Sequence, residues 1–198
     1  MCLLFETIKV VDGTFCNLDY HCKRMNFARQ KLYSCNDFIF LEDNLKVPEN
    51  MQTGVVKCRV EYSKKIENIE FINYKPRKIS TLQIVYDDKI SYSYKFSNRN
   101  SFENLKKYII ADEILFVKNN FITDTSFSNI IFFDGQKWLT PSTPLLKGTK
   151  RQELLDKKII IEQKITPYDL KKFSKAKLIN AMLDFDNTFE IDVSNILV

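Results

Sequence analysis

Histidine is nearly absent from this sequence of 198 residues, which contains only one, and no two cysteines form a CxxC pair. With His21 alone, a metal site built from several imidazoles is excluded, and structural zinc lacks its usual ligands. The five cysteines all lie within the first 58 residues, and their odd number argues against a disulfide framework. No metal is therefore expected, and demanding chemistry must come from carboxylates, lysines, hydroxyls or an organic cofactor.

Long apolar runs are also missing. No stretch approaches the roughly 20 residues that a membrane-spanning helix needs. Residues 1–5 are apolar, but Glu6 and Lys9 follow directly, with neither a basic leader before them nor a small-residue cleavage site. The sequence therefore predicts a cytoplasmic protein without a membrane partner.

The charge of the chain is positive but evenly spread. A net charge of +5 arises from 30 basic and 25 acidic residues. The densest basic cluster, residues 75–78, is short and is typical of a solvated connection between two units. A modest positive field attracts anionic small molecules as readily as RNA. We therefore expect no nucleic-acid partner and an anionic small molecule as the substrate.

The hydropathy pattern predicts strands mixed with short helices. Alternating apolar and polar residues predict strands near residues 5–11, 56–62, 69–74, 81–86, 91–96, 113–117, 121–123, 128–133, 137–140, 158–164 and 176–182. Helical spacing predicts helices at residues 19–34, 100–110, 149–157 and 166–175.

Local turn signals support this assignment. Asp12-Gly13 and Asp134-Gly135 are typical of hairpin turns. Thr166 followed by a proline favours a helix start. The sequence therefore predicts an α+β (mixed α/β) fold in two lobes. We place residues 1–80 in a small N-terminal lobe and residues 81–198 in a larger C-terminal lobe.

Three places could carry chemistry. Lys95 ends an aromatic-rich segment, where desolvation would free its amine as a nucleophile, although a lysine at a strand end usually just reaches water. Gly148 and Thr149 precede a helix and could offer backbone N–H groups to a phosphate, although such pairs are commonly plain caps. Asp124 and Thr125 stand together between two strands, where a turn is the usual explanation.

In combination, these segments resemble the class IV aminotransferases, which are pyridoxal-phosphate enzymes of fold type IV. The matching motifs are Phe-Glu-Thr-Ile/Met-Arg-Val, His-x-x-Arg-Leu, Lys-x-x-Asn/Thr-Arg, Asp-Glu…Asn-(apolar)-Phe and Thr-Pro…Gly-x-x-Arg. Their counterparts here are residues 5–13 (FETIKVVDG), 21–25 (HCKRM), 95–99 (KFSNR), 112–132 and 140–151, followed by residues 179–182 (INAM). The resemblance covers nearly the whole chain in the correct order.

The resemblance implies a small N-terminal α/β sandwich, a larger C-terminal pseudobarrel that carries the lysine, and a cofactor site between them. It implies that Lys95 bonds covalently to pyridoxal 5'-phosphate and shuttles protons. Arg24 would bind the phosphate, unless it is simply an exposed helix residue. Gly148 and Thr149 would bind the same phosphate.

Three further residues are assigned by the same resemblance. Asp124 occupies the place of a glutamate that pairs with the pyridine nitrogen, and Thr125 stands beside it. Asn180 would lie near the phosphate. His21 belongs to a family motif, but we expect it to be structural. The family usually forms its site near a dimer interface, so a homodimer is expected.

The motifs leave the reaction open. Lys-x-x-Asn-Arg and Asn180-Ala181 favour the family's lyase branch, which converts 4-amino-4-deoxychorismate, an anionic amine, to 4-aminobenzoate and pyruvate in folate biosynthesis. The alternative is an aminotransferase that acts on a branched-chain or D-amino acid. Asp124, and a start almost at residues 5–13, keep a third alternative open: a catalytically degenerate relative with a binding or structural role.

Overall fold

The computed structural model describes residues 2–186 and 188–197, and it confirms the predicted α+β class. Contacts between Cα atoms divide the chain into two units. Unit 1 comprises Met1–Pro76 and Tyr94–Asn98, and unit 2 comprises Arg77–Ser93 and Arg99–Val198. This grouping differs from the predicted division after residue 80, chiefly because the segment that carries Lys95 packs with unit 1 instead of the larger unit.

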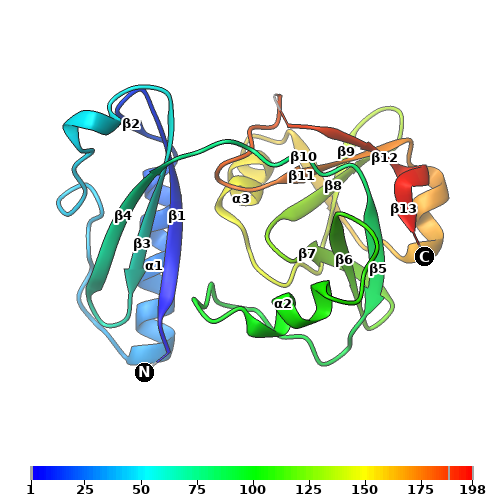
Figure 1. The fold of residues 1–198 in the computed structure, drawn as a ribbon. Coiled ribbons are helices and arrows are strands. Elements are labelled where there is room, and N and C mark those ends of the chain that lie inside the picture. Colours follow the sequence, from blue (N-terminus) through cyan, green and yellow to red (C-terminus); the bar gives the residue numbers. More distant parts are fainter. Residues whose placement is uncertain (1, 187, 198) are drawn as a thin grey trace. The chain divides into compact units, whose positions relative to one another are not determined.

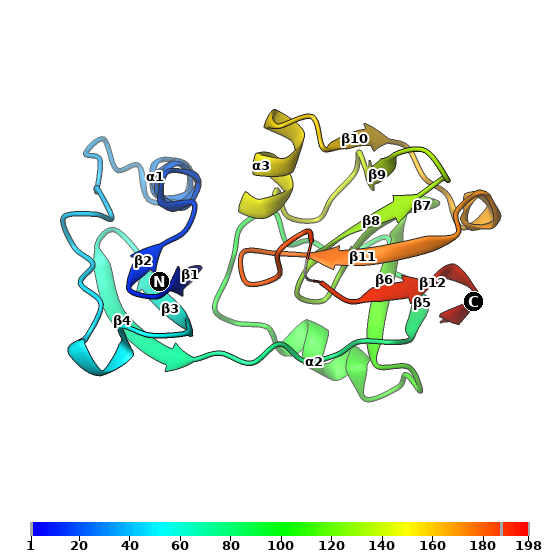
Figure 2. The same ribbon diagram turned by 90° about the horizontal axis from the view of Figure 1, so that it is seen from above.

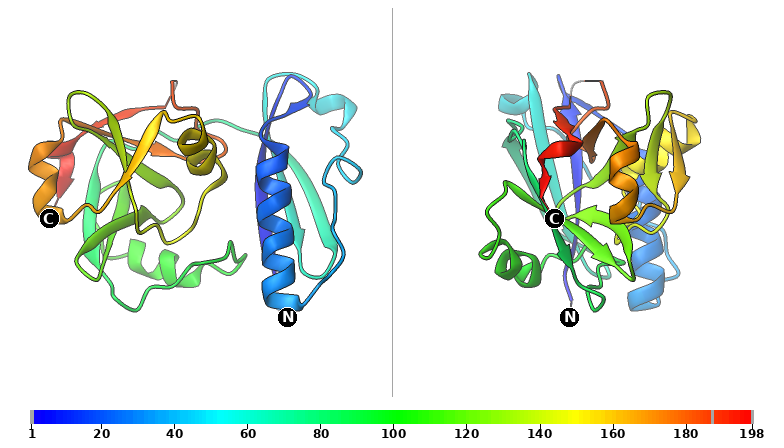
Figure 3. Two further views of the ribbon diagram at one scale, coloured as in Figure 1. Left: turned by 180° about the vertical axis from the view of Figure 1, so that it is seen from behind. Right: turned by 90° about the vertical axis from the view of Figure 1, so that its right-hand side faces the viewer.

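Unit 1 is one sheet covered by one long helix. The strand order is β2-β1-β3-β4, and all neighbouring strands are antiparallel. Figure 3 shows α1 lying along one face of this sheet. The elements of unit 1 are β1 (Leu4–Val11), β2 (Thr14–Phe15), α1 (Leu18–Tyr33), a 3-10 helix (Glu49–Met51), β3 (Val55–Tyr62) and β4 (Ile66–Asn73).

Strand alternation explains the packing of unit 1. Every second residue of β3 is buried, and these residues contact Leu4, Ile8 and Val10 of β1 and Met25 of α1 in one apolar cluster. The predicted hairpin at Asp12-Gly13 is present. The cluster therefore fixes which face of the sheet the helix covers.

Unit 2 contains two sheets. One has the order β10-β9-β8-β11-β12 and the other β13-β5-β6-β7 (Figures 1 and 2). Their elements are β5 (Leu82–Tyr86), α2 (Asn100–Lys106), β6 (Glu113–Lys118), β7 (Phe121–Thr125), β8 (Asn129–Phe133), β9 (Trp138–Pro141), α3 (Thr149–Asp156), β10 (Ile160–Gln163), β11 (Lys175–Ile179), β12 (Glu190–Asp192) and β13 (Ile196–Leu197), with 3-10 helices at Pro167–Lys172 and Val193–Asn195.

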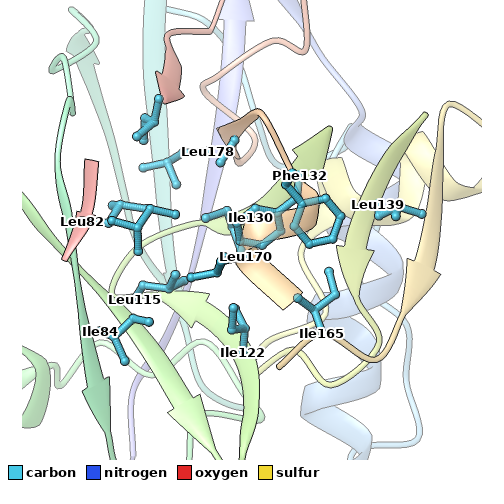
Figure 4. Close-up of a cluster of buried hydrophobic side chains, with 14 of the residues drawn as sticks. Leu82, Ile84, Leu115, Ile122, Ile130, Phe132, Leu139, Ile165, Leu170 and Leu178 are labelled. Atoms are coloured by element: carbon cyan, nitrogen blue, oxygen red, sulfur yellow. The ribbon is translucent and has the colours of Figure 1, made fainter. Parts of the chain in front are cut away.

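Side chains from both sheets of unit 2 form one apolar core. Figure 4 shows Leu82 of β5 and Leu115 of β6 on one side, with Ile130 of β8 and Leu139 of β9 on the other. All four are at most 3% exposed. This shared core holds β7 and β8 in place, and the predicted site residues Asp124 and Thr125 end β7 instead of lying in the turn that follows it.

Two sequence predictions need correction. Residues 91–96 form no strand, and only an isolated bridge pairs Phe96 with Leu4. The helix predicted from residue 166 is a single 3-10 helix, although Thr166 and Asp169 form the expected reciprocal cap. Residues 91–96 do not form a strand because only their last residues pair with the start of β1. The helix after Thr166 remains a short 3-10 helix because the backbone is already extended at Phe173.

Candidate functional site

Lys95 lies on a short segment of unit 1 that pairs with the start of β1. The N–H of Phe5 donates to the carbonyl of Lys95 over 2.9 Å, and the N–H of Ser97 donates to the carbonyl of Leu3 over 2.8 Å. The lysine is half-buried, and its Nζ lies 4.6 Å from the centre of the Phe5 ring. Backbone hydrogen bonds therefore fix the segment from which this amine projects.

A second cation contacts the same aromatic ring. The guanidinium carbon of Arg59 lies 4.0 Å from the centre of the Phe5 ring. Arg59 is held by Glu61, whose Oε1 accepts from its Nη2 over 2.7 Å. Since Phe5 is only 5% exposed, its ring forms an apolar floor beneath two cationic groups.

Arg24 of α1 is bound to a buried carboxylate of β1. Its Nε donates to Oε1 of Glu6 over 2.9 Å, and its Nη2 donates to Oε2. Nδ1 of His21 lies 2.6 Å from the same Oε2. Glu6 and His21 are fully buried, while the Arg24 side chain is 17% exposed. We call these three residues the Glu6 triad.

The ionisation of the Glu6 triad follows from its contacts. Burial alone would raise the pKa of Glu6, but the charge of Arg24 and the hydrogen bonds from His21 and Arg24 outweigh it and hold this pKa at about 2. Burial lowers the pKa of His21, and the nearby charges of Arg24 and Lys95 lower it further, against the effect of Glu6. Glu6 is therefore an anion and His21 a neutral imidazole that donates Nδ1–H to it.

In unit 2, Asp124 connects three segments. Its Oδ1 accepts from Nδ2 of Asn129 over 2.7 Å, and its Oδ2 accepts from the N–H of Leu146 over 2.9 Å. Nδ2 of Asn129 also donates to the carbonyl of Leu146 over 2.9 Å. Burial of this carboxyl raises its pKa to about 6, against the hydrogen bonds of Leu146 and Asn129 and the charge of Arg151.

Gly148 caps the N-terminus of α3 next to Asn129. A Cβ at this glycine would lie 2.0 Å from Oδ1 of Asn129, which leaves no room for any other residue. Thr149 is the first residue of α3 and is buried. The structure therefore places both predicted phosphate-binding residues at the start of a helix, where backbone N–H groups and the helix dipole favour an anion.

The other two predicted residues of unit 2 stabilise turns. The Thr125 hydroxyl donates to the carbonyl of Ser128 over 3.0 Å. Oδ1 of Asn180 accepts from the N–H groups of Met182 and Leu183, over 2.8 and 3.1 Å. Asn180 follows β11 directly, and the residue before it pairs with Asn129 in the sheet. It therefore lies at the same end of the sheet as Asn129.

Three buried polar atoms of unit 2 lack a hydrogen-bond partner within the described residues: Oε2 of Glu113, which has an ion pair with Lys106, Oγ of Ser126 and Nε of Arg151. Ser126 and Arg151 concern the site. Both residues are 2% exposed. Ser126 follows the Asp124-Thr125 pair, and the charge of Arg151 acts on Asp124. An unpaired buried donor is costly, so a polar ligand at this place would relieve it. Within unit 2, these donors and the helix start at Gly148 suit a phosphate, and within unit 1 the Lys95 amine suits an aldehyde, so the groups of each unit are compatible with a phosphorylated pyridine aldehyde.

The structure thus groups the predicted residues into two sets. Lys95 and Arg24 lie in unit 1, where the backbone of Lys95 pairs with Phe5 and the Arg24 side chain binds Glu6, the next residue of β1. The other predicted residues, Asp124, Thr125, Gly148, Thr149 and Asn180, lie in unit 2, where Asn129 is bonded to Asp124, lies next to Gly148 and pairs in the sheet with the residue before Asn180. Sequence reasoning missed Glu6 as the partner of Arg24. A signal was present, because Glu6 stands in the buried phase of β1 between Leu4 and Ile8, and His21 and Arg24 lie three residues apart on one helix face.

The described residues contain no group of three or more His, Cys, Asp or Glu side chains that could hold a metal ion. Within residues 2–186 and 188–197, no helix has the length and apolar character that crossing a membrane requires.

Comparison with known proteins places this chain in a family. The model of the class IV aminotransferases matches residues 3–185. An uncharacterised protein of Haemophilus influenzae is 35% identical over 182 residues, which cover 90% of this chain and 97% of the relative. A protein of Schizosaccharomyces pombe provisionally named aminodeoxychorismate lyase is 28% identical over 171 residues, which cover 77% of this chain and 73% of the relative.

A crystal structure from Haemophilus somnus, of a protein provisionally named 4-amino-4-deoxychorismate lyase, is also similar. It superposes with a TM-score of 0.86 at 33% identity, covering 92% of this chain and 97% of that chain. The chain therefore belongs to the class IV aminotransferase family, and the predicted family and fold are confirmed. It is a member of a family of pyridoxal-phosphate-dependent enzymes.

Proposed function

We propose that this protein is a pyridoxal-phosphate-dependent lyase that converts 4-amino-4-deoxychorismate to 4-aminobenzoate and pyruvate, a reaction of folate biosynthesis. The observation that carries this proposal is the placement of Lys95. Backbone hydrogen bonds join its segment to the start of β1, its amine lies over the Phe5 ring, and its charge is one of those that lower the pKa of His21. A lysine held on an apolar floor beside an arginine suits an amine that must bond to an aldehyde and then move a proton.

The residues of both units have distinct tasks in this proposal. When bound, pyridoxal phosphate supplies an electron-withdrawing ring. Lys95 would hold the cofactor, and Arg24 would bind its phosphate with help from the N-terminus of α3 at Gly148 and Thr149. Asp124 would face the pyridine nitrogen, where a carboxylate favours the protonated ring. Thr125 and Asn180 would keep the surrounding turns in place and contact the cofactor.

The proposed reaction needs no second substrate. Nζ of Lys95 would take the proton from C4 of aminodeoxychorismate, the bond between C3 and the enolpyruvyl oxygen would break, and the ring would become aromatic. The departing enolpyruvate would take up a proton at its methylene carbon and become pyruvate. The substrate divides completely into 4-aminobenzoate and pyruvate. An aminotransferase instead needs a keto acid to accept the amino group, so dependence on an acceptor separates the two reactions. The similarity to proteins named as lyases favours the first.

A direct test measures pyruvate release. The purified protein, loaded with pyridoxal phosphate and given aminodeoxychorismate without a keto acid, should form pyruvate and 4-aminobenzoate in equal amounts. Lys95→Ala should reduce this rate by at least about a thousandfold, because it removes the group that moves the proton. Borohydride treatment followed by peptide mass spectrometry should place the cofactor on Lys95 in the wild type.

Two results would overturn the proposal. Turnover that requires a keto acid would make the protein an aminotransferase. A protein that takes up no pyridoxal phosphate on Lys95 would be a degenerate relative. Lys118→Ala is a matched control, because this lysine donates to the carbonyl of Ile90 in unit 2 and has no assigned part in the reaction.

We also propose that the protein acts in the cytoplasm as a homodimer on an anionic amine. The odd number of cysteines, which argues against a disulfide framework, supports a reducing compartment, and the usual position of the family's site near a dimer interface supports the dimer. Light scattering after size-exclusion chromatography should give twice the chain mass of 23.4 kDa.

A further inference from the structure

We propose that Glu6 is a positioning residue for the cofactor phosphate: the buried Glu6 carboxylate, oriented by His21, holds the Arg24 guanidinium in the plane in which it binds the phosphate. This inference rests on the proposed function. It assigns a role to a strand residue and a helix residue that touch neither substrate nor cofactor in it.

In this geometry His21 orients Glu6, and Glu6 in turn orients Arg24. Nδ1–H of His21 donates to Oε2 of Glu6, which fixes one edge of the carboxylate. Both carboxylate oxygens then accept from Arg24, one from Nε and one from Nη2. A bidentate pair of this kind holds the two planar groups in a common plane. The guanidinium uses two of its five N–H bonds in the pair, and the remaining three lie outside it.

Stability alone does not explain this arrangement. Glu6 is 0% exposed in the apolar phase of β1, between Leu4 and Ile8. Burying a carboxylate is costly, and replacing a buried ion pair by apolar residues of similar size is often neutral or stabilising. An apolar residue at position 6 would therefore serve the core at least as well. A buried carboxylate at this position is therefore better explained by its effect on Arg24, whose guanidinium it holds in one orientation.

Arg24 is the member of the Glu6 triad that reaches the surface. Its side chain is 17% exposed, whereas Glu6 and His21 are fully buried. The backbone of Lys95 pairs with that of Phe5, which precedes Glu6 in β1, so the triad lies near the segment whose lysine would hold the cofactor. An arginine left unsupported would sample several rotamers, and each phosphate contact would then cost side-chain entropy. Fixing it in advance lowers that cost.

The test compares pyridoxal phosphate with pyridoxal, which lacks the phosphate. Affinity for each is measured by titration, with borohydride-trapped adduct on Lys95 as the second readout. Glu6→Gln and Glu6→Asp should each lower the preference for the phosphorylated form by about tenfold, the usual effect of removing a supporting contact. Glu6→Asp keeps the charge but is too short, so it separates orientation from charge. Glu190→Gln, which removes a surface partner of Lys175, should leave the preference unchanged.

A double-mutant cycle shows whether Glu6 acts through Arg24. Arg24→Lys should lower the preference by itself, and adding Glu6→Gln to it should cause no further loss. Equal losses for both ligands in Glu6→Gln would mean a merely structural role, and losses that multiply in the double variant would mean independent action. Either result overturns the inference.

Failure of the proposed function is distinguishable from failure of this inference. His21 is the only histidine, so its imidazole gives one unambiguous set of ¹⁵N signals. In the wild type they should show the Nδ1–H form, and inorganic phosphate should shift them, but not in Arg24→Lys or Glu6→Gln. If wild type takes up no pyridoxal phosphate yet shows this pattern, only the proposed function fails. If phosphate leaves the imidazole unchanged in wild type, the positioning role fails.

Discussion

Glu6 in unit 1 and Asp124 in unit 2 are both buried carboxylates, but their surroundings shift their pKa values in opposite directions. Glu6 accepts from a guanidinium and an imidazole, and its pKa is about 2. Asp124 accepts from an amide side chain and a backbone N–H, and its pKa is about 6. Burial acts in the same sense on both, so the difference comes from the charge of the partner.

This difference suits two different tasks. A carboxylate that remains charged under all ordinary conditions can hold an arginine permanently in place. A carboxylate whose pKa lies near neutrality can respond to a proton or a cation that arrives beside it, as the ring nitrogen would in the proposed reaction. The contrast yields predictions that can be ranked by the size of their effect.

The largest effect is expected from removing the charge partner in unit 1. Glu6→Ala leaves a guanidinium and an imidazole facing a cavity, and we expect the free energy of unfolding to fall by about 3–5 kcal/mol, as when a buried pair loses one member. Urea denaturation followed by circular dichroism would measure it. A loss below about 1 kcal/mol would show that Arg24 simply turns to solvent, and that Glu6 and Asp124 differ less than their contacts imply.

The pH dependence of stability should have opposite signs at the two sites. The native pKa of Asp124 lies above its ordinary value of 3.8, so this carboxyl binds its proton more tightly when folded. Its contribution to stability therefore grows as pH falls from about 6 to about 4, by on the order of 3 kcal/mol. The native pKa of Glu6 lies below its ordinary value of 4.5, so its contribution is present above pH 4.5 and is lost as pH falls towards about 2.

Asp124→Asn and Glu6→Gln isolate these two contributions. The difference in unfolding free energy between wild type and Asp124→Asn should become more favourable to the wild type on acidification below about pH 6. The corresponding difference for Glu6→Gln should become less favourable below about pH 4.5. Parallel curves for the two variants would remove the contrast.

The two carboxylates also differ in how much of their surroundings could be predicted from the sequence. Alternation in residues 55–62 and the Asp12-Gly13 turn were sufficient to predict the sheet of unit 1, because each is a local signal. The motifs around Lys95 and Gly148 led to the family, because their order and spacing are specific. The role of Glu6 depends on α1 packing over β1, and the membership of residues 94–98 in unit 1 depends on backbone pairing with Leu3 and Phe5. The pairing of residues 94–98 leaves no local pattern, and the pattern that Glu6 leaves, a carboxylate among buried positions of β1, does not identify Arg24 as its partner.

A smaller effect is expected from disturbing the neutral donors of Asp124. Gly148→Ala would place a Cβ 2.0 Å from Oδ1 of Asn129, and that side chain cannot yield without losing its bonds to Asp124 and Leu146. We expect a loss of about 1–3 kcal/mol in urea denaturation. In a background of Asn129→Ala the same substitution should cost much less, because the opposing atom is gone. Additive losses would mean that the contact with Asn129 is not the source of the cost.

The smallest effect is expected at a paired carboxylate that is not buried. Glu190 binds Lys175 over 2.9 Å, but the two side chains are 46% and 36% exposed. Water screens this pair, so Glu190→Gln should change the free energy of unfolding by less than about 0.5 kcal/mol, and added salt should weaken even that. The substitution makes the same chemical change as Glu6→Gln, so the ratio of the two losses measures what burial adds to an ion pair. A loss at Glu190 as large as that at Glu6 would show that burial is not the source of the difference.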